Sequence, residues 1–244
     1  MVTESGRSAV PGRVVRLVLP CALAALAVGG QMLLSSRHPH PSPVIAEGAF
    51  AALGGLRSIA AEVIWFRADR LQEEGRYVEL AQLASALTFM EPHTPEVWSY
   101  AAWNLAYNVS VMMPTPEDRW RWVEAGLRLL RDEGLERNPT SRELLRELAW
   151  MFEIKIGADI DSAAAHYRER WRAIVEDVRA RGAWSELRMD PEEMRRIEAV
   201  TGFDDWTDPQ LSAIYWGLRG RCADIVAQAS MIYMRRHGLP LPTR

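Results

Sequence analysis

Residues 63–92 read VIWFRADRLQEEGRYVELAQLASALTFMEP. Apolar side chains recur three and four positions apart in this stretch, as at Leu80, Ala84 and Leu87, and this spacing is typical of an amphipathic helix. Gly75 interrupts the pattern and marks a turn, because glycine adopts backbone conformations that other residues avoid. The stretch therefore predicts a helix, a tight turn and a second helix.

Two later stretches superimpose on this one as a helix, a turn and a second helix. Residues 94–109 read TPEVWSYAAWNLAYNV and residues 141–157 read SRELLRELAWMFEIKIG. A capping residue followed by proline at the first helical position favours a helix start. Such pairs are Thr94-Pro95, Thr115-Pro116, Asp190-Pro191 and Asp208-Pro209. No run alternates as a strand would, so the fold is expected to be all-α. Helices are expected at about 59–74, 77–90, 95–112, 117–134, 141–156, 161–181, 191–200, 209–219 and 221–236, after a short apolar helix or turn at 47–56.

The three stretches resemble the tetratricopeptide repeat (TPR), a helix–turn–helix unit with small, aromatic and Trp positions on its first helix. The matching positions are Trp98, Ala101, Ala102 and Leu105, then Leu145, Leu148, Ala149 and Phe152, with Gly75-Arg76-Tyr77 at a turn and Glu91-Pro92 and Asn138-Pro139 at repeat ends. The two closing prolines lie 47 residues apart rather than roughly 34, which places an insertion near 112–119. The resemblance implies antiparallel helical hairpins stacked as a short solenoid over 47–181, with a C-terminal helical cap over 182–244.

The TPR resemblance also implies a partner-binding groove lined by the first helix of each repeat. Carried over position by position, the groove residues are Glu62, Trp65, Asp69 and Gln72, then Glu96, Ser99, Trp103 and Ala106, then Glu143, Arg146, Trp150 and Glu153. Tryptophan and arginine are frequent energetic anchors of interfaces. Three tryptophans and five acids in one groove favour a basic or apolar helix or peptide as the partner. The alternative is that the rings are core and the acids a solvated face.

The chain has ten tryptophans, and we expect those outside the groove to have other roles. Trp98, Trp120 and Trp171 lie on apolar helical stripes, so we expect them to be core. In Arg119-Trp120-Arg121-Trp122, Trp120 faces inward, and Arg119, Arg121 and Trp122 form a second candidate contact with a partner or with lipid headgroups. The alternative for these arginines is cation–π stacking within the fold. Trp206 and Trp216 belong to the C-terminal cap, and Trp184 has no assigned role.

The N-terminal region predicts a membrane segment. Residues 14–34, VVRLVLPCALAALAVGGQMLL, are long enough to cross the hydrocarbon core as a helix. Arg7, Arg13 and Arg16 precede or begin the segment, so the positive-inside rule places residues 1–13 in the cytoplasm. In a bacterium this gives a single-pass inner-membrane protein with its remaining domain in the periplasm. The alternative is a signal peptide cleaved near Ala25-Leu26-Ala27.

The remaining domain follows a short linker. The N-terminal tip and anchor are expected to span 1–36, and the Pro-rich linker 37–46. Residues 1–37 hold four of the 29 basic and one of the 32 acidic residues, so the rest of the chain has a net charge of −6. This charge disfavours nucleic acid as a partner. The anchor, the repeats and the segment from Asp205 to Trp216 together also resemble a group of membrane-anchored bacterial envelope proteins, a resemblance that implies no activity.

Catalytic and cofactor signals are weak. Cys21 and Cys222 do not form a disulfide framework, and His38 and His40 of the linker are too few for a metal site, so no metal or cofactor is expected. No nucleophile or phosphate-binding motif is present. His166 lies in sequence near Asp159, Asp161 and Glu169, which leaves a hydrolase as the weakest alternative. The sequence favours a scaffold subunit of an envelope complex that is not an enzyme, with a glycan-binding protein that uses exposed Trp as the next alternative.

Overall fold

The computed structural model describes residues 54–241, and side chains from residue 62 onward. Ile59–Arg244 form one compact unit, and the other unit, Met1–Ser58, is described only over the first residues of helix α3. The predicted membrane segment 14–34 and the linker 37–46 lie outside the described residues. Within the described part, no helix is both long and apolar enough to cross a membrane.

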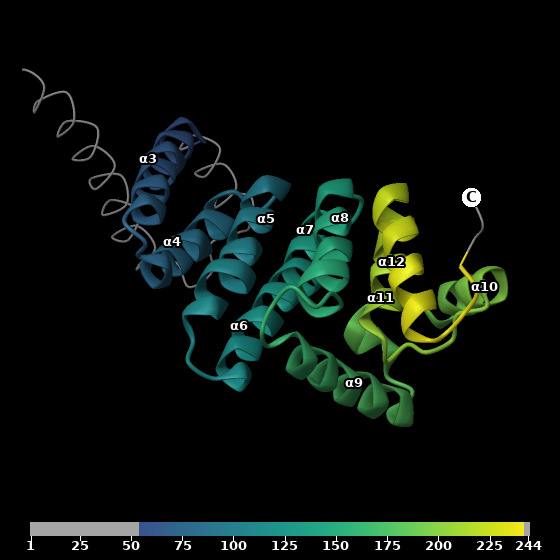
Figure 1. The fold of residues 1–244 in the computed structure, drawn as a ribbon. Coiled ribbons are helices and arrows are strands. Elements are labelled where there is room, and N and C mark those ends of the chain that lie inside the picture. The colour runs from purple at the N-terminus through teal and green to yellow at the C-terminus, as the bar shows by residue number, and fades with distance from the viewer. Residues whose placement is uncertain (1–53, 242–244) are drawn as a thin grey trace, which may run out of the picture. The chain divides into compact units, whose positions relative to one another are not determined.

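All regular structure in the described part of the chain is helical, as the sequence predicts (Figure 1). The main helices are α3 (Gly54–Glu73), α4 (Tyr77–Met90), α5 (Pro95–Trp103), α6 (Pro116–Arg128), α8 (Arg142–Trp150), α9 (Ala164–Arg181), α10 (Pro191–Thr201), α11 (Pro209–Gly220) and α12 (Ala223–Arg236). Short elements complete them: π-helical turns at Asn104–Val109, Leu129–Gly134 and Met151–Ile156, 3₁₀ turns at Ser110–Met112 and Trp184–Leu187, and α7 (Leu135–Arg137).

Local capping explains where several helices begin. Thr115, Asp190 and Asp208 each accept a hydrogen bond from a backbone N–H in the first turn of the helix that follows. These bonds satisfy N–H groups that have no partner within the helix. Thr94 begins α5 without such a bond, and there Pro95 fixes the first helical residue. The predicted cap–proline pairs therefore start helices at all four positions.

Helices adjacent in the chain pack against one another. α4 packs on α5, α5 and its π-turn pack on α6, and α11 lies between α8 and α12. A Cβ on Gly126 would lie 2.8 Å from the carbonyl oxygen of Ala102, so α6 approaches α5 closely. The Pro92 carbonyl oxygen accepts hydrogen bonds from Trp98 Nε1 and Asn138 Nδ2, both at 2.9 Å. These bonds tie together the segments that the sequence marks as repeat ends.

The core is continuous from α5 to α12 and rich in aromatic rings. Trp98, Trp120 and Trp171 are at most 4% exposed, which confirms the prediction that they are core. Trp206 and Trp216 are also buried, and Trp184 is half-buried beside Trp206. Most of α11 is buried, so the C-terminal helices share this core rather than lying on its surface.

The single lysine of the chain is also buried. Lys155 Nζ lies 2.6 Å from Asp161 Oδ2, and both side chains are less than a tenth exposed. Asp161 also accepts hydrogen bonds from the Ala163 N–H and the Tyr167 hydroxyl. The Lys155 ammonium lies 5.2 Å from the ring centroid of Tyr107, so the ion pair lies against the π-turn that follows α5.

Candidate functional site

α5 and α8, with their π-turns, bring eight side chains to or just beneath one surface, which we call the α5–α8 face. Its members are Glu96, Ser99, Trp103 and Tyr107 from α5 and its π-turn, and Glu143, Glu147, Trp150 and Glu153 from α8 and its π-turn. Near the helix starts, burial raises the pKa of Glu143, with Ser99 opposing and Glu96 adding to the shift. Near the helix ends, Trp150 and Glu147 both neighbour Tyr107. The two helices therefore run side by side in the same direction.

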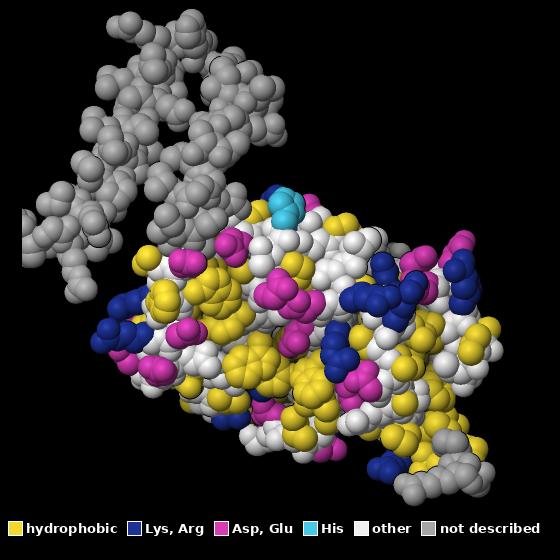
Figure 2. All heavy atoms as spheres, turned by 90° about the horizontal axis from the view of Figure 1, so that it is seen from above, with side chains coloured by type: hydrophobic (Ala, Val, Ile, Leu, Met, Phe, Trp, Pro, Cys, Tyr) yellow, Lys and Arg dark blue, Asp and Glu magenta, His cyan; other side chains and the backbone are white. Residues whose placement is uncertain are grey.

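Two tryptophans of this face are exposed to solvent. Trp103 and Trp150 are 38% and 39% exposed, unlike the buried core tryptophans. The Trp103 ring stacks on Tyr107 with centroids 5.7 Å apart. Figure 2 shows large hydrophobic side chains gathered in the middle of one side of the molecule, with acidic side chains beside them. Exposed indoles fixed by packing can contact a partner at little entropic cost.

One buried carboxylate oxygen of the face is left without a partner. Glu147 Oε1 is a buried atom with no hydrogen bond in the part of the chain that the structure describes. Burial raises the pKa of Glu147, and the nearby Glu143 adds to the shift while Arg146 opposes it. A buried polar atom without a hydrogen-bond partner lowers stability and is uncommon in folded proteins. It indicates a place where a ligand could donate the missing hydrogen bond.

The π-turns rotate two predicted groove residues inward. The resemblance placed Ala106 and Glu153 in the groove, but they are 0% and 2% exposed. A π-turn has more residues per turn than an α-helix, so the positions after Trp103 and Trp150 shift around the axis. Ala106 becomes core. Glu153 lies beneath the surface of the face instead of on it.

Glu153 is the most perturbed acid of the face. Burial, followed by the charge of Asp224, raises the pKa of Glu153 to about 7, while Arg146 opposes the shift. Tyr107 also neighbours this carboxyl group. No hydrogen bond to the Glu153 carboxylate and no salt bridge of it is found within residues 62–241.

This raised pKa predicts a pH-dependent effect of Glu153→Gln. An acid whose folded-state pKa is raised contributes stability that is full below the unfolded value of 4.5 and lost as pH rises through about 7. Glutamine mimics the protonated form, so the variant should melt about 4 °C above wild type near pH 8.5 and within about 1 °C of it near pH 5. Circular dichroism melting checks this. Equal melting temperatures at both pH values, or a shift of the same size in Glu169→Gln, would contradict it.

Arg146 closes the C-terminal side of the face by binding the cap. Its Nη2 lies 3.0 Å from Asp224 Oδ2 at the start of α12. Arg146 was predicted as a groove residue, and it is half-exposed there, but its charge is already paired. Asp224 was not predicted, because it lies 78 residues further along the chain.

The first-repeat residues gather around Tyr100 rather than around the two exposed tryptophans. Trp65 is half-buried, with its ring centroid 5.1 Å from that of Tyr100. Gln72 Oε1 accepts a hydrogen bond from the Tyr100 hydroxyl at 3.0 Å. Burial raises the pKa of Tyr100, and Asp69 adds to the shift. Glu62 is exposed, and no contact within the described residues joins it to this group.

The second predicted contact, at the start of α6, is mostly used by the fold. Trp120 faces inward as predicted, and Trp122 is half-buried. Arg119 donates to the Met113 carbonyl and to Ser162 Oγ, so it is a structural link rather than a free contact. Arg121 is exposed and pairs with Asp118 in its own helix.

The predicted histidine–carboxylate site has a different partner. His166 Nε2 lies 3.0 Å from Glu117 Oε2 on α6. The nearby acids of the sequence are used elsewhere: Asp161 binds Lys155, and Asp159 binds Arg168. No cluster of potential metal ligands is found in residues 54–241.

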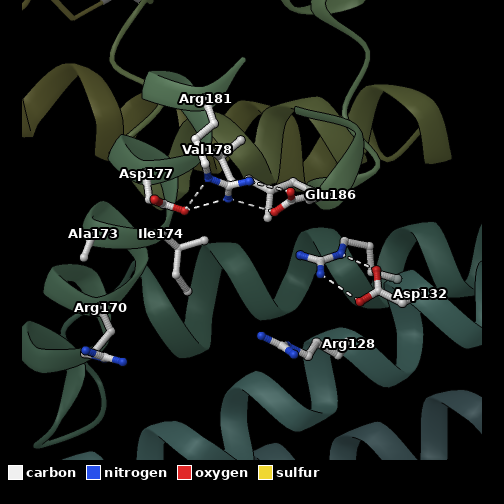
Figure 3. A pocket seen from close by; sticks show the side chains of 11 residues that line it. Arg128, Asp132, Arg170, Ala173, Ile174, Asp177, Val178, Arg181 and Glu186 are labelled. Atoms are coloured by element: carbon white, nitrogen blue, oxygen red, sulfur yellow. Dashed lines mark hydrogen bonds and ion pairs between the residues drawn. The ribbon is translucent and has the colours of Figure 1, made fainter. Parts of the chain in front are cut away.

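A hollow of about 450 Å³ lies between α6, α9 and the 3₁₀ turn at Trp184–Leu187 (Figure 3). Its charged side chains are all paired, either with one another or, as for Arg128 and Arg170, with acids outside the hollow. Arg181 bridges Asp177 and Glu186 at 2.6 and 2.5 Å, and Arg131 binds Asp132 at 2.7 Å. Because these charges satisfy each other, this hollow offers a ligand less than the α5–α8 face does.

Comparison of the chain with protein-family models, with curated proteins and with solved structures gives no match.

Proposed function

We propose that the chain is a membrane-anchored, extracytoplasmic TPR-like scaffold that binds a partner protein or peptide on the α5–α8 face. The observation that carries the proposal is the pair Trp103 and Trp150, 47 residues apart in the sequence and equally exposed on neighbouring helices. Both belong to a chain whose other aromatic residues mostly fill a core. A repeated exposed indole beside unpaired carboxylates fits recognition better than packing.

Helix order supports a TPR-like arrangement. α5 and α8, the first helices of the second and third predicted repeats, lie side by side, and the connecting helix α6 packs behind α5. Stacked hairpins of this kind present their first helices on a shared surface. This arrangement supports the face as the site at which a partner would bind.

The proposed location rests on the sequence. Segment 14–34 would anchor the chain in a bacterial inner membrane with residues 1–13 in the cytoplasm. The face would then lie in the periplasm, where an accessory subunit of an envelope complex would meet its partner.

A glycan is the second candidate ligand. The observation that favours it is again the exposure of Trp103 and Trp150, since flat indoles can stack on sugar rings. The acids beside them favour a basic peptide, because carboxylates in a partly buried site bind cations strongly.

Site-specific photo-crosslinking in cells tests the proposal. A benzoyl-phenylalanine placed at Trp103 or Trp150 of the full chain should give a discrete protein adduct, because both positions would touch the partner. Phe89, which is 83% exposed on α4, is the control position and should give no such adduct. Adducts that contain glycan but no protein would favour the second candidate. The same pattern from all three positions, or no adduct from either tryptophan, would refute a binding face.

A further inference from the structure

We infer that the middle of the α5–α8 face is a subsite for one arginine side chain of a basic partner segment. This inference rests on the proposed function and names the chemistry of the partner. The subsite is built around Tyr107. Trp103 stacks on the Tyr107 ring. Burial raises the pKa of Tyr107, the charges of Glu147 and Glu153 add to the shift and Trp150 opposes it, so these three residues lie near that side chain. Two exposed indoles and two carboxylates therefore share one neighbour.

The charge of the face is unbalanced. None of the carboxylates of Glu96, Glu143, Glu147 and Glu153 takes part in a salt bridge in the part of the chain that the structure describes. The nearest cations are engaged elsewhere, since Arg146 pairs with Asp224 and Lys155 with Asp161. Four acids without a basic partner are complementary to a cationic ligand.

Buried polar atoms give an independent indication. Glu153 is 2% exposed, and no described group donates to its carboxylate. Glu147 Oε1 is also buried without a hydrogen-bond partner among the described residues. An arginine carries five N–H donors in a planar group that also stacks on indole rings. It could bind the carboxylates of Glu147 and Glu153 at once, which a lysine ammonium does less well.

The same chain has two aromatic–carboxylate clusters that already hold a cation. The Arg219 guanidinium lies 5.6 and 5.5 Å from the ring centroids of Tyr215 and Trp216, with Glu193 3.7 Å away. Lys155 lies over Tyr107 and Tyr167 and binds Asp161. Lys155 thus already lies over the Tyr107 ring of the α5–α8 face. Within residues 62–241 no cation lies over the indoles of Trp103 and Trp150, so the partner is expected to bring one there.

Fluorescence anisotropy with labelled peptides tests the inference on the full-length chain in a mild nonionic detergent. The probes are ten-residue peptides that alternate alanine with arginine, lysine or glutamine. Near pH 8.5, where Glu153 is ionised, the arginine peptide should bind at least about tenfold more tightly than the glutamine peptide and more tightly than the lysine peptide. Glu147→Gln and Glu153→Gln should each weaken it about fivefold.

Glu169→Gln is the matched control, because it removes the same charge from an exposed position on α9. It should change the affinity less than about twofold. Equal binding of the arginine and glutamine peptides, an equal loss in all three variants, or no binding of the arginine peptide up to about 1 mM would overturn the inference. Crosslinks at Trp103 and Trp150 would then still support the proposed function. Their absence would remove that function as well.

Discussion

Replacing Asp161 with alanine is expected to lower the free energy of unfolding by about 3–5 kcal/mol. Lys155 is 3% exposed, and its ammonium lies 2.6 Å from Asp161. Removing the carboxylate leaves a buried cation without a counter-charge, which costs more than the pair itself contributes. The melting temperature should fall by about 10 °C, measured by circular dichroism or urea unfolding.

The effect should also depend on pH. Burial acts to raise the pKa of Asp161, but hydrogen bonds from Lys155 and Ala163 outweigh it, so the pKa lies below its usual value. A lowered carboxyl pKa contributes stability that is present above the unfolded pKa and lost as pH falls through the folded one. The difference in free energy of unfolding between wild type and Asp161→Ala should therefore become smaller at acidic pH.

Two comparisons separate the buried pair from a general effect of this loop. Asp159→Ala removes an exposed acid from the same loop and should cost less than about 1 kcal/mol. The double variant Lys155→Met/Asp161→Ala should recover part of the loss, because no buried charge remains. A double variant less stable than Asp161→Ala would show that the missing counter-charge is not the cause.

The helices could be predicted because their signals are local. Prolines after Thr115, Asp190 and Asp208 fix the first turn, and the preceding side chain caps it. The expected start of the helix at 161–181 was early, because Asp161 binds Lys155 and caps the Ala163 N–H, so α9 begins at Ala164. The ion pair with Lys155, which lies in a different helical segment, sets the start of α9. The spacing of apolar residues in the sequence does not reveal such a pair.

The face was predictable only in part, for a related reason. Trp103 and Trp150 occupy positions that a regular helix predicts, since they precede the π-turns. Beyond them the regular spacing fails, so Glu153 was expected on the surface and Tyr107 was missed. Tyr100 and Glu147 were also missed, although both lie on the same helical faces as predicted residues. The predicted groove residues were spaced strictly three or four positions apart, so the prediction included only one residue from each helical turn.

The double variant Trp103→Ala/Trp150→Ala is expected to lose about 100-fold or more in affinity for the arginine peptide or for a crosslinked partner. Each ring is more than a third exposed, and each flanks Tyr107, so truncation removes contact surface from both sides of the proposed subsite. Central aromatic residues of interfaces commonly contribute 2 kcal/mol or more, about 30-fold in affinity.

The loss in the double variant should be less than the product of the two single losses. Trp103 and Trp150 neighbour the same tyrosine, and residues that share a contact are not additive. Removing either indole also exposes Tyr107 and the carboxyl group of Glu147 to water, which weakens the attraction that remains for a cation. Phe89→Ala removes a more exposed ring from α4 and should leave the affinity within about twofold. A double variant that keeps its melting temperature and binds within threefold of wild type would mean that these indoles are exposed for a reason other than this partner.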